Sequence, residues 1–266
     1  VAPQLLDAMG YSTMVRELEP QFVYQGIRNG DVDVSLGAWM PAHKDMVQPL
    51  LDDGVAVQLA ANLEGAIQGL AVPTYTYEAG VESVADLDEN GDMFNRQIYA
   101  IGAGAAMTRA FQDAVKSDYM GLGDWEVVPS STAGMLSQVK RKTRKGEHIV
   151  FHGWKPHWMD IQFDIRFLEA DPEGKLAGME TTVYTIVRKG YPERQPQIAR
   201  FLKQFQGPLK AQSVWIDGFN RKERDPDTVA VDWIQANMDV VAQWVDGVQA
   251  ADGGSAMAAI RRELGG

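Results

Sequence analysis

The chain has 266 residues, of which 45% are hydrophobic and 23% charged, a formal net charge of −11 and no cysteine. This length suits two α/β lobes or one large domain, and the composition is that of a globular rather than a disordered protein. The lack of cysteine excludes disulfides, thiolate metal sites and a cysteine nucleophile. Because the chain is acidic and no stripe of basic and aromatic residues stands out, we expect no nucleic-acid partner.

Helices and short strands alternate through the first part of the chain. Hydrophobic periodicity and glycine or proline boundaries predict helices at 3–9, 22–29, 46–51, 83–87, 107–116 and 130–139. Strands are expected at 12–18, 32–36, 55–59, 62–73, 97–101, 125–128 and 149–151. The pattern predicts an α/β fold. Since the sequence begins abruptly, in what looks like a helix, we expect residues upstream of Val1.

The pattern changes after a strand expected at 182–187. Helices are predicted at 197–205, 209–219, 226–237, 240–248 and 256–264. Trp215, Trp233 and Trp244 lie on these helices at amphipathic spacing, which favours packing in a core. The turn-rich segment after residue 73 marks a domain boundary. We therefore expect one lobe formed by residues 1–73 with 186–266, and a second lobe formed by residues 74–185.

Two strands are followed by the same pattern, a glycine and then Trp-x-Pro. Gly37 and Gly153 are expected to end their strands, so that Trp39 and Trp154 stand on the turns that follow. Open α/β sheets bind ligands beyond the carboxyl ends of their strands. Two facing indoles would hold a quaternary ammonium group by cation–π attraction and apolar contact. The alternative interpretation is that both tryptophans pack in a core.

A loop and a histidine are candidates for binding the polar end of a ligand. The loop at Gly104 and Ala105 opens a helix and offers backbone N–H donors to a carboxylate, although it fits a plain βα turn equally well. The dinucleotide fingerprint is incomplete here, because Met107 stands where a third glycine belongs. His157 is able to donate a hydrogen bond to a ligand or to its own loop.

The sequence contains no motif of a serine hydrolase, a Walker loop or a zinc protease. Its four histidines have no cysteines beside them and do not suggest a metal site. We therefore expect a binding protein without a cofactor. An enzyme acting on a small polar metabolite, or a binding protein for another nutrient such as an amino acid, remains the alternative. The basic cluster at 140–145 is interpreted as the solvated end of a helix.

Five motifs together resemble the glycine betaine/choline-binding proteins of ABC importers. They are Gly-Ala-Trp-Met-Pro at 37–41, Asn-Leu-Glu-Gly at 62–65, Gly-Leu-Ala-Val-Pro at 69–73, Gly-Met-Leu at 134–136 and Gly-Trp-Lys-Pro-His at 153–157. Thr-Val-Tyr-Thr at 182–185 and the helical tail also fit. The resemblance implies a two-lobed periplasmic-binding-protein-like fold of type II, with a ligand cleft between the lobes. It also implies a periplasmic or lipid-anchored receptor that acts as a monomer and delivers its ligand to a membrane permease.

The resemblance implies an aromatic box for a small methylated ammonium compound. The expected ligand-binding residues are Trp39, Trp154, Gln68, Gly104, Ala105 and His157. Three departures from the family's pattern bear on the ligand. The family's additional N-terminal strand, which in choline binders carries a box Trp and an Asp, would precede Val1, and Gln68 and Ala105 replace a Tyr and an Asn of choline binders. These departures favour glycine betaine, another betaine or trimethylamine N-oxide over choline, because Gln68 is able to donate to a ligand oxygen.

Overall fold

The computed structural model, which describes residues 1–169 and 172–265, divides into two compact units. The first unit is Val1–Glu64 with Thr182–Gly266, and the second is Gly65–Thr181. Both boundaries fall inside strands, β2 (Ala56–Pro73) and β7 (Met179–Arg188), instead of at residues 73 and 185. Turn-forming residues predict later boundaries, whereas a continuous strand that leaves one unit carries no such mark in the sequence.

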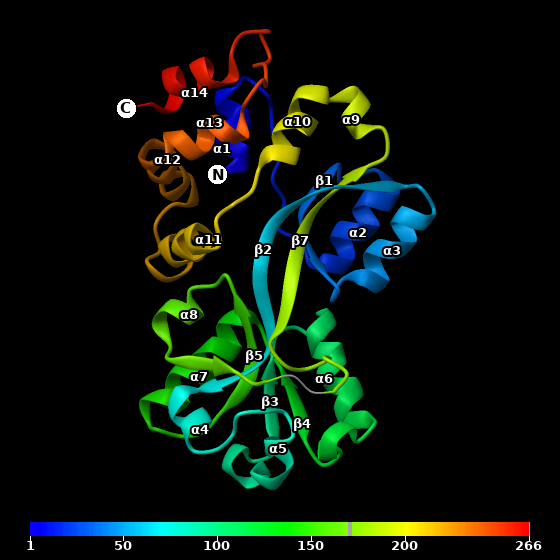
Figure 1. Cartoon of the computed structure of the whole chain (residues 1–266), viewed down its shortest axis with the longest axis vertical. Helices are drawn as coiled ribbons and strands as arrows, with labels where there is room; N and C mark the ends of the chain where they lie inside the picture. Colours follow the sequence, from blue (N-terminus) through cyan, green and yellow to red (C-terminus); the bar gives the residue numbers. More distant parts are fainter. Residues whose placement is uncertain (170–171, 266) are drawn as a thin grey trace. The chain divides into compact units, whose positions relative to one another are not determined.

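The first unit consists of a small sheet and many helices (Figure 1). Its strand β1 (Val34–Met40) pairs antiparallel with β7. Its helices are α1 (Ala2–Ala8), α2 (Pro20–Asn29), α3 (Lys44–Asp52), α9 (Tyr191–Arg194), α10 (Pro196–Gln204), α11 (Leu209–Ile216), α12 (Pro226–Ala236), α13 (Met238–Trp244) and α14 (Ala256–Leu264), with the short η3 (Asp217–Arg221) after α11.

Two apolar cores hold the first unit together. One lies under α2 and α3, where Ile27 and Val47 pack with Ala38 of β1. The other joins α1 to the C-terminal helices. Trp244 is buried in this second core, and Trp215 and Trp233 pack against it, which confirms the interpretation of the three tail tryptophans.

The expected strand at 12–18 is absent, since residues 11–19 form no regular element. Met14 is 79% exposed and Val15 is 72% exposed. The apolar and polar residues of this segment suit a strand, but strand conformation requires a neighbouring strand that accepts its hydrogen bonds. The prediction was wrong because periodicity describes one segment and cannot supply its partner.

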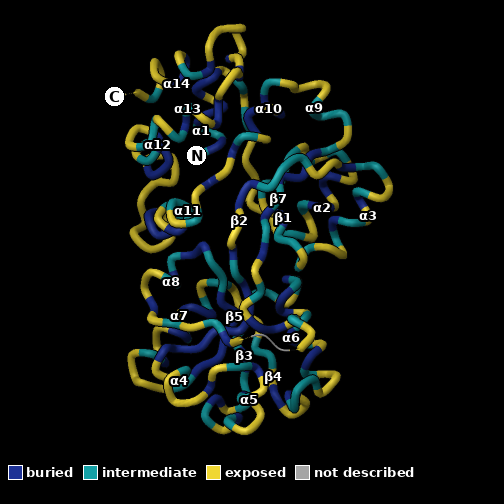
Figure 2. Tube along the Cα trace, viewed as in Figure 1, coloured by how far each residue is buried: buried dark blue, intermediate teal, exposed yellow. Residues whose placement is uncertain are grey.

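The second unit is a mixed sheet between helices (Figure 1). Its strands are the second part of β2, β3 (Gln97–Ala100), β4 (Glu126–Pro129), β5 (Val150–Lys155) and β6 (Ile165–Phe167). Strand β3 pairs in parallel with both β4 and β5. Strand β2 pairs antiparallel with β5 and β6. Its helices are α4 (Thr74–Glu78), α5 (Asp86–Glu89), α6 (Ala106–Lys116), α7 (Thr132–Arg144) and α8 (Met159–Gln162), with the short η1 (Gly91–Phe94) and η2 (Tyr119–Gly121). Residues 150–153 of β5 are buried at the centre of this unit (Figure 2).

The strands expected at 55–59 and 62–73 are one continuous strand, β2. Gly69 has a φ of 154°, and a Cβ atom at this position would lie 2.1 Å from the carbonyl oxygen of Ala177. The neighbouring Leu70 donates its N–H to the carbonyl oxygen of Leu176 at 2.7 Å. Gly69 therefore does not interrupt β2. It allows the 176–177 segment to approach the backbone of β2 closely.

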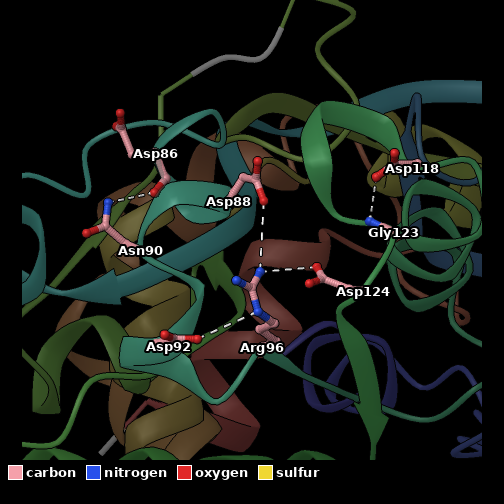
Figure 3. A network of polar contacts seen from close by, with 8 residues as sticks. All are labelled: Asp86, Asp88, Asn90, Asp92, Arg96, Asp118, Gly123 and Asp124. Carbon is pink, nitrogen blue, oxygen red and sulfur yellow. Dashed lines mark hydrogen bonds and ion pairs between the residues drawn. The ribbon is translucent and has the colours of Figure 1, made fainter.

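A group of acidic residues surrounds one arginine at the start of the parallel strands (Figure 3). The guanidinium of Arg96 lies 3.1 Å from the carboxylate of Asp124, 3.9 Å from that of Asp88 and 3.8 Å from that of Asp92. Arg96 directly precedes β3 and Asp124 closely precedes β4. The arginine thus neutralises part of the local acidic charge and links the segments that lead into these paired strands.

Within residues 1–169 and 172–265, no helix has both the length and the apolar character needed to cross a bilayer.

Candidate ligand-binding site in the second unit

Trp154 is positioned by the centre of the second unit's sheet. It is the next-to-last residue of β5 and is half-buried. Strand pairing places it directly opposite Gln68 of β2, and Gly153 opposite Gly69. The prediction that this strand ends at Gly153 was wrong, because β5 continues to Lys155. Trp154 is therefore held by a paired strand rather than by a turn, which gives its indole a more rigid support.

The indole of Trp154 lies beside two imidazole rings. Its ring centroid is 5.0 Å from that of His152 and 4.8 Å from that of His157. The row of rings continues on both sides, to Phe111 of α6 beyond His152 and to Trp158 beyond His157. Because its neighbours are rigid rings, the indole is fixed in its orientation without any ligand contact.

His157 presents a defined tautomer. Its Nδ1 accepts a hydrogen bond from the backbone N–H of Met159 at 3.2 Å. Burial lowers the pKa of His157 to about 4, so the ring is neutral at pH 7. A neutral imidazole whose Nδ1 accepts a hydrogen bond carries its proton on Nε2. His157 is thus a neutral hydrogen-bond donor next to Trp154.

His152 also belongs to this group, although it was not among the predicted ligand-binding residues. It is 4% exposed, and neither ring nitrogen has a hydrogen-bond partner among the described residues. Burial lowers its pKa to about 3. The available signal was strand alternation, since residues 152 and 154 of one strand point to the same face. The ring therefore acts as an uncharged support for Trp154 at neutral pH.

Gln68 is buried, and its amide lies next to the start of β7. Its Nε2 donates to the hydroxyl of Thr181 at 3.4 Å, and that hydroxyl donates to the carbonyl oxygen of Met179. An amide nitrogen carries two donors. One donor is directed to Thr181, which leaves a second for another acceptor. Gln68 and Trp154 are thus paired across two strands in an orientation set by the sheet.

The loop of Gly104 and Ala105 lies at the same edge of the sheet as Trp154, because β3 and β5 are parallel and both end there. The N–H of Ala105 is already used, since it donates to the carbonyl oxygen of Gly102 at 2.9 Å. Helix α6 begins at Ala106, and no side chain caps it. The N–H groups of its first turn have no acceptor within the helix. The N–H groups of this loop that remain available to a ligand therefore belong to the first turn of α6, and not to Ala105 itself.

Trp39 belongs to the first unit. It lies inside β1, opposite Val183 of β7, and is half-buried. The backbone N–H of Trp39 donates to Nδ1 of His43 at 3.4 Å. Gly37 does not end the strand as expected; the pairing shifts between Ser35 and Ala38, which makes a β-bulge before Trp39. The two Trp-x-Pro motifs thus share an in-strand tryptophan, and both X–Pro bonds are cis.

The structure brings Gln68, Trp154 and His157 together in the second unit, with the Gly104–Ala105 loop at the same sheet edge. Trp39 is the one expected site residue in the first unit. An indole face, an amide donor and a neutral imidazole donor are thus neighbours in space: Gln68 lies opposite Trp154 across two strands, and the ring of His157 lies beside that of Trp154. Chemically, this group is able to hold an apolar cation and a hydrogen-bond acceptor. Among the described residues, no group of three or more potential ligands is arranged to hold a metal ion.

We expect the two buried imidazoles to make the protein sensitive to acid. Their pKa values in the folded chain are lowered from 6.5 to about 3 for His152 and about 4 for His157. Below pH 6.5 the unfolded chain therefore binds more protons, and the stability that is complete above this pH is lost as the pH falls. Each imidazole should reduce the free energy of unfolding by up to about 1.4 kcal/mol per pH unit.

Denaturant unfolding at a series of pH values between neutral and acidic measures this loss, with the variant His152→Leu as the comparison. The variant should show a shallower pH dependence, and its stability at pH 7 should not fall, because it replaces an unpartnered polar ring by an apolar group. An unchanged slope in His152→Leu would contradict the neutral state of His152.

Comparison with known proteins identifies the family of the chain. Residues 1–236 match the model of the family described as the substrate binding domain of ABC-type glycine betaine transport systems. A glycine betaine/carnitine transport binding protein of Listeria monocytogenes is 35% identical over 187 residues, which cover 69% of this chain and 61% of that protein. The chain thus spans less than two thirds of the length of this relative.

Two solved structures are similar over most of their length. One is an ABC-transporter choline-binding protein in complex with choline, with a TM-score of 0.92 and 32% identity over 99% of this chain and 92% of the other. The second is lactococcal OpuAC in its closed conformation with glycine betaine, with a TM-score of 0.83 and 30% identity over 92% of each chain. The fold is therefore the two-lobed α/β fold of periplasmic binding proteins.

Proposed function

Because the chain belongs to the family of substrate-binding domains of ABC-type glycine betaine transport systems, we propose that it binds a small methylated ammonium compound and delivers it to a membrane permease. The family binds solutes and is not a family of enzymes. We propose that the protein acts outside the cytoplasm, in the periplasm or anchored by a lipid, and as a monomer. Trimethylamine N-oxide, choline and betaines are the candidate ligands.

The observation that carries the proposal is the fixed indole of Trp154 with its neutral neighbours. The π face of an indole attracts a cation, and a quaternary ammonium group needs no hydrogen-bond acceptor. An imidazolium next to the ring would repel such a ligand. Burial keeps both His152 and His157 neutral at pH 7, so the attraction of the ring for a cation is preserved. Trp39 of the first unit is proposed as the second indole that contacts the methyl groups.

The donors near Trp154 favour a ligand with an oxygen at its other end. We propose that Nε2–H of His157, the amide of Gln68 and backbone N–H groups near Gly104 and Ala105 bind this oxygen. A carboxylate accepts several hydrogen bonds at once, whereas the hydroxyl of choline accepts fewer. A betaine therefore satisfies these donors better than choline does. Glycine betaine is the smallest of the candidate ligands that carries both a trimethylammonium group and a carboxylate.

A thermal-shift screen tests the proposal. The screen compares glycine betaine, choline, trimethylamine N-oxide, carnitine and dimethylsulfoniopropionate, with glycine as the control that lacks the methyl groups. A ligand present at about 100 times its dissociation constant adds about 2.7 kcal/mol of stability. We expect the largest shift with glycine betaine and none with glycine. No shift with any methylated compound would contradict the proposed function, and turnover of a ligand by the purified protein would favour the enzyme alternative.

A further inference from the structure

Helix α7 of the second unit carries an unusual concentration of positive charge. Lys140, Arg141, Arg144 and Lys145 are all exposed at or just after its end, in a chain whose net charge is −11. The fifth basic residue of the cluster, Lys142, is buried instead, with its ammonium over the ring of Tyr99. The cluster is therefore divided into one buried residue and four that face solvent.

The helix dipole does not account for this arrangement. The C-terminus of a helix carries about half an elementary negative charge, which is far less than four positive charges. Lys140 and Arg144 are four residues apart on one face, where like charges repel. Lys145 lies 3.5 Å from Glu147, but no described residue forms an ion pair with Lys140 or Arg144. Two positive charges thus remain unneutralised next to each other.

The same two residues line a hollow on the surface of the second unit. This hollow of about 490 Å³ is lined by Tyr75, Lys140, Thr143, Arg144, Gln162, Phe163 and Asp164. The carboxylate of Asp164 accepts a hydrogen bond from the hydroxyl of Thr74 at 2.7 Å. The hollow therefore combines two free cations with hydroxyl and amide groups, and its single carboxylate is engaged.

Apolar side chains are exposed next to these cations. Tyr75 is 36% exposed and lines the hollow, and Ile161, which precedes Gln162 in α8, is 53% exposed. Figure 1 shows α4, α7 and α8, which carry these residues, on one side of the second unit. Basic residues combined with exposed tyrosine and aliphatic groups are typical of surfaces that rest on anionic membranes.

We propose that this basic face, defined by Lys140, Arg141, Arg144, Lys145 and Tyr75, docks on the anionic lipid headgroups of the membrane. The proposal rests on the proposed function, because a protein that delivers a ligand to a permease works beside a membrane. The phosphates complement the free charges of Lys140 and Arg144. The rest of the acidic protein is repelled by the same lipids, so the attraction selects one face of the second unit. Docking would keep the receptor close to the permease.

Vesicle co-sedimentation tests this inference on the full chain. Vesicles of phosphatidylcholine alone are compared with vesicles of equal parts phosphatidylcholine and phosphatidylglycerol. We expect binding to the anionic vesicles only, weakening as salt is added. The double variant Lys140→Gln with Arg144→Gln should weaken partitioning by at least about twentyfold, since each basic residue near such a surface contributes about a factor of five.

The matched control removes two exposed lysines of the first unit, Lys203→Gln with Lys210→Gln, and changes the net charge equally. This control should keep the wild-type partitioning, and both double variants should keep the wild-type thermal shift with glycine betaine. Failure of the wild type to bind anionic vesicles at low salt, or equal binding by the Lys140/Arg144 variant, would overturn the inference. Either result would leave the ligand-binding proposal intact, because that proposal is measured separately by the thermal shift.

Discussion

Replacing Trp154 by alanine is expected to weaken the binding of a methylated ammonium ligand by at least about 1–2 kcal/mol, the contribution of a desolvated cation–π contact. This corresponds to a dissociation constant about five- to thirtyfold higher, as measured by isothermal calorimetry. The loss follows from the position of the indole, which is already fixed by His152 and His157. Its contribution to binding is therefore not reduced by a cost of ordering the ring.

Two further variants separate the role of the ring in binding from its role in packing. Trp154→Phe keeps a smaller aromatic face and should lose less affinity than alanine. Trp125→Phe changes a buried tryptophan of the same unit that packs on Phe94 and lies outside the proposed site. Affinity should be unchanged in this control. Wild-type affinity in Trp154→Ala would remove Trp154 from the site.

Replacing His157 by alanine is expected to weaken the binding of glycine betaine more than the binding of choline. His157 is neutral, and Nδ1 accepts from Met159, so the proton on Nε2 is available to a ligand. A hydrogen bond to a charged group contributes about 1.5–3 kcal/mol, and a carboxylate gains this contribution. The hydroxyl of choline is uncharged and gains less. The measurement is the ratio of the two dissociation constants before and after the substitution.

The variant His157→Asn controls for the local structure. An asparagine side chain accepts a hydrogen bond from a backbone N–H two residues later, as His157 does from Met159, and it retains a donor. It should therefore keep the turn into α8 and part of the preference for glycine betaine. An equal loss of affinity for both ligands in His157→Ala, together with a lowered melting temperature without ligand, would mean that His157 only maintains this turn.

Much of the fold was predictable because it depends on local patterns. The helices at the ends of the chain follow from apolar spacing that buries one face, and α14 (Ala256–Leu264) lies where the pattern places it. The parallel strand β3 and the helix α6 after it were expected almost residue by residue. The two Trp-x-Pro motifs were also visible, since they depend only on residue order.

The errors occurred where long-range contacts decide the structure. The segment at 12–18 has a strand-like pattern and forms no strand, because no strand pairs with it. Gly37 and Gly153 were expected to end strands, and both lie inside them. A glycine that ends a strand and a glycine that permits a close approach look the same in a sequence. Only the tertiary structure, in which Gly153 pairs with Gly69 inside the sheet, shows that Gly153 does not end its strand.

By itself, the sequence determined the α/β class, the amphipathic helices of the tail and the residue types of the candidate site, because spacing and composition act within short segments. The tertiary structure decided what those residues are able to do. Strand register placed Gln68 opposite Trp154, and packing set His152 against the indole. Burial then made both imidazoles neutral, and the Met159 contact set the tautomer of His157. Proton affinity and hydrogen-bond direction depend on surroundings that distant segments supply, and no local pattern encodes them.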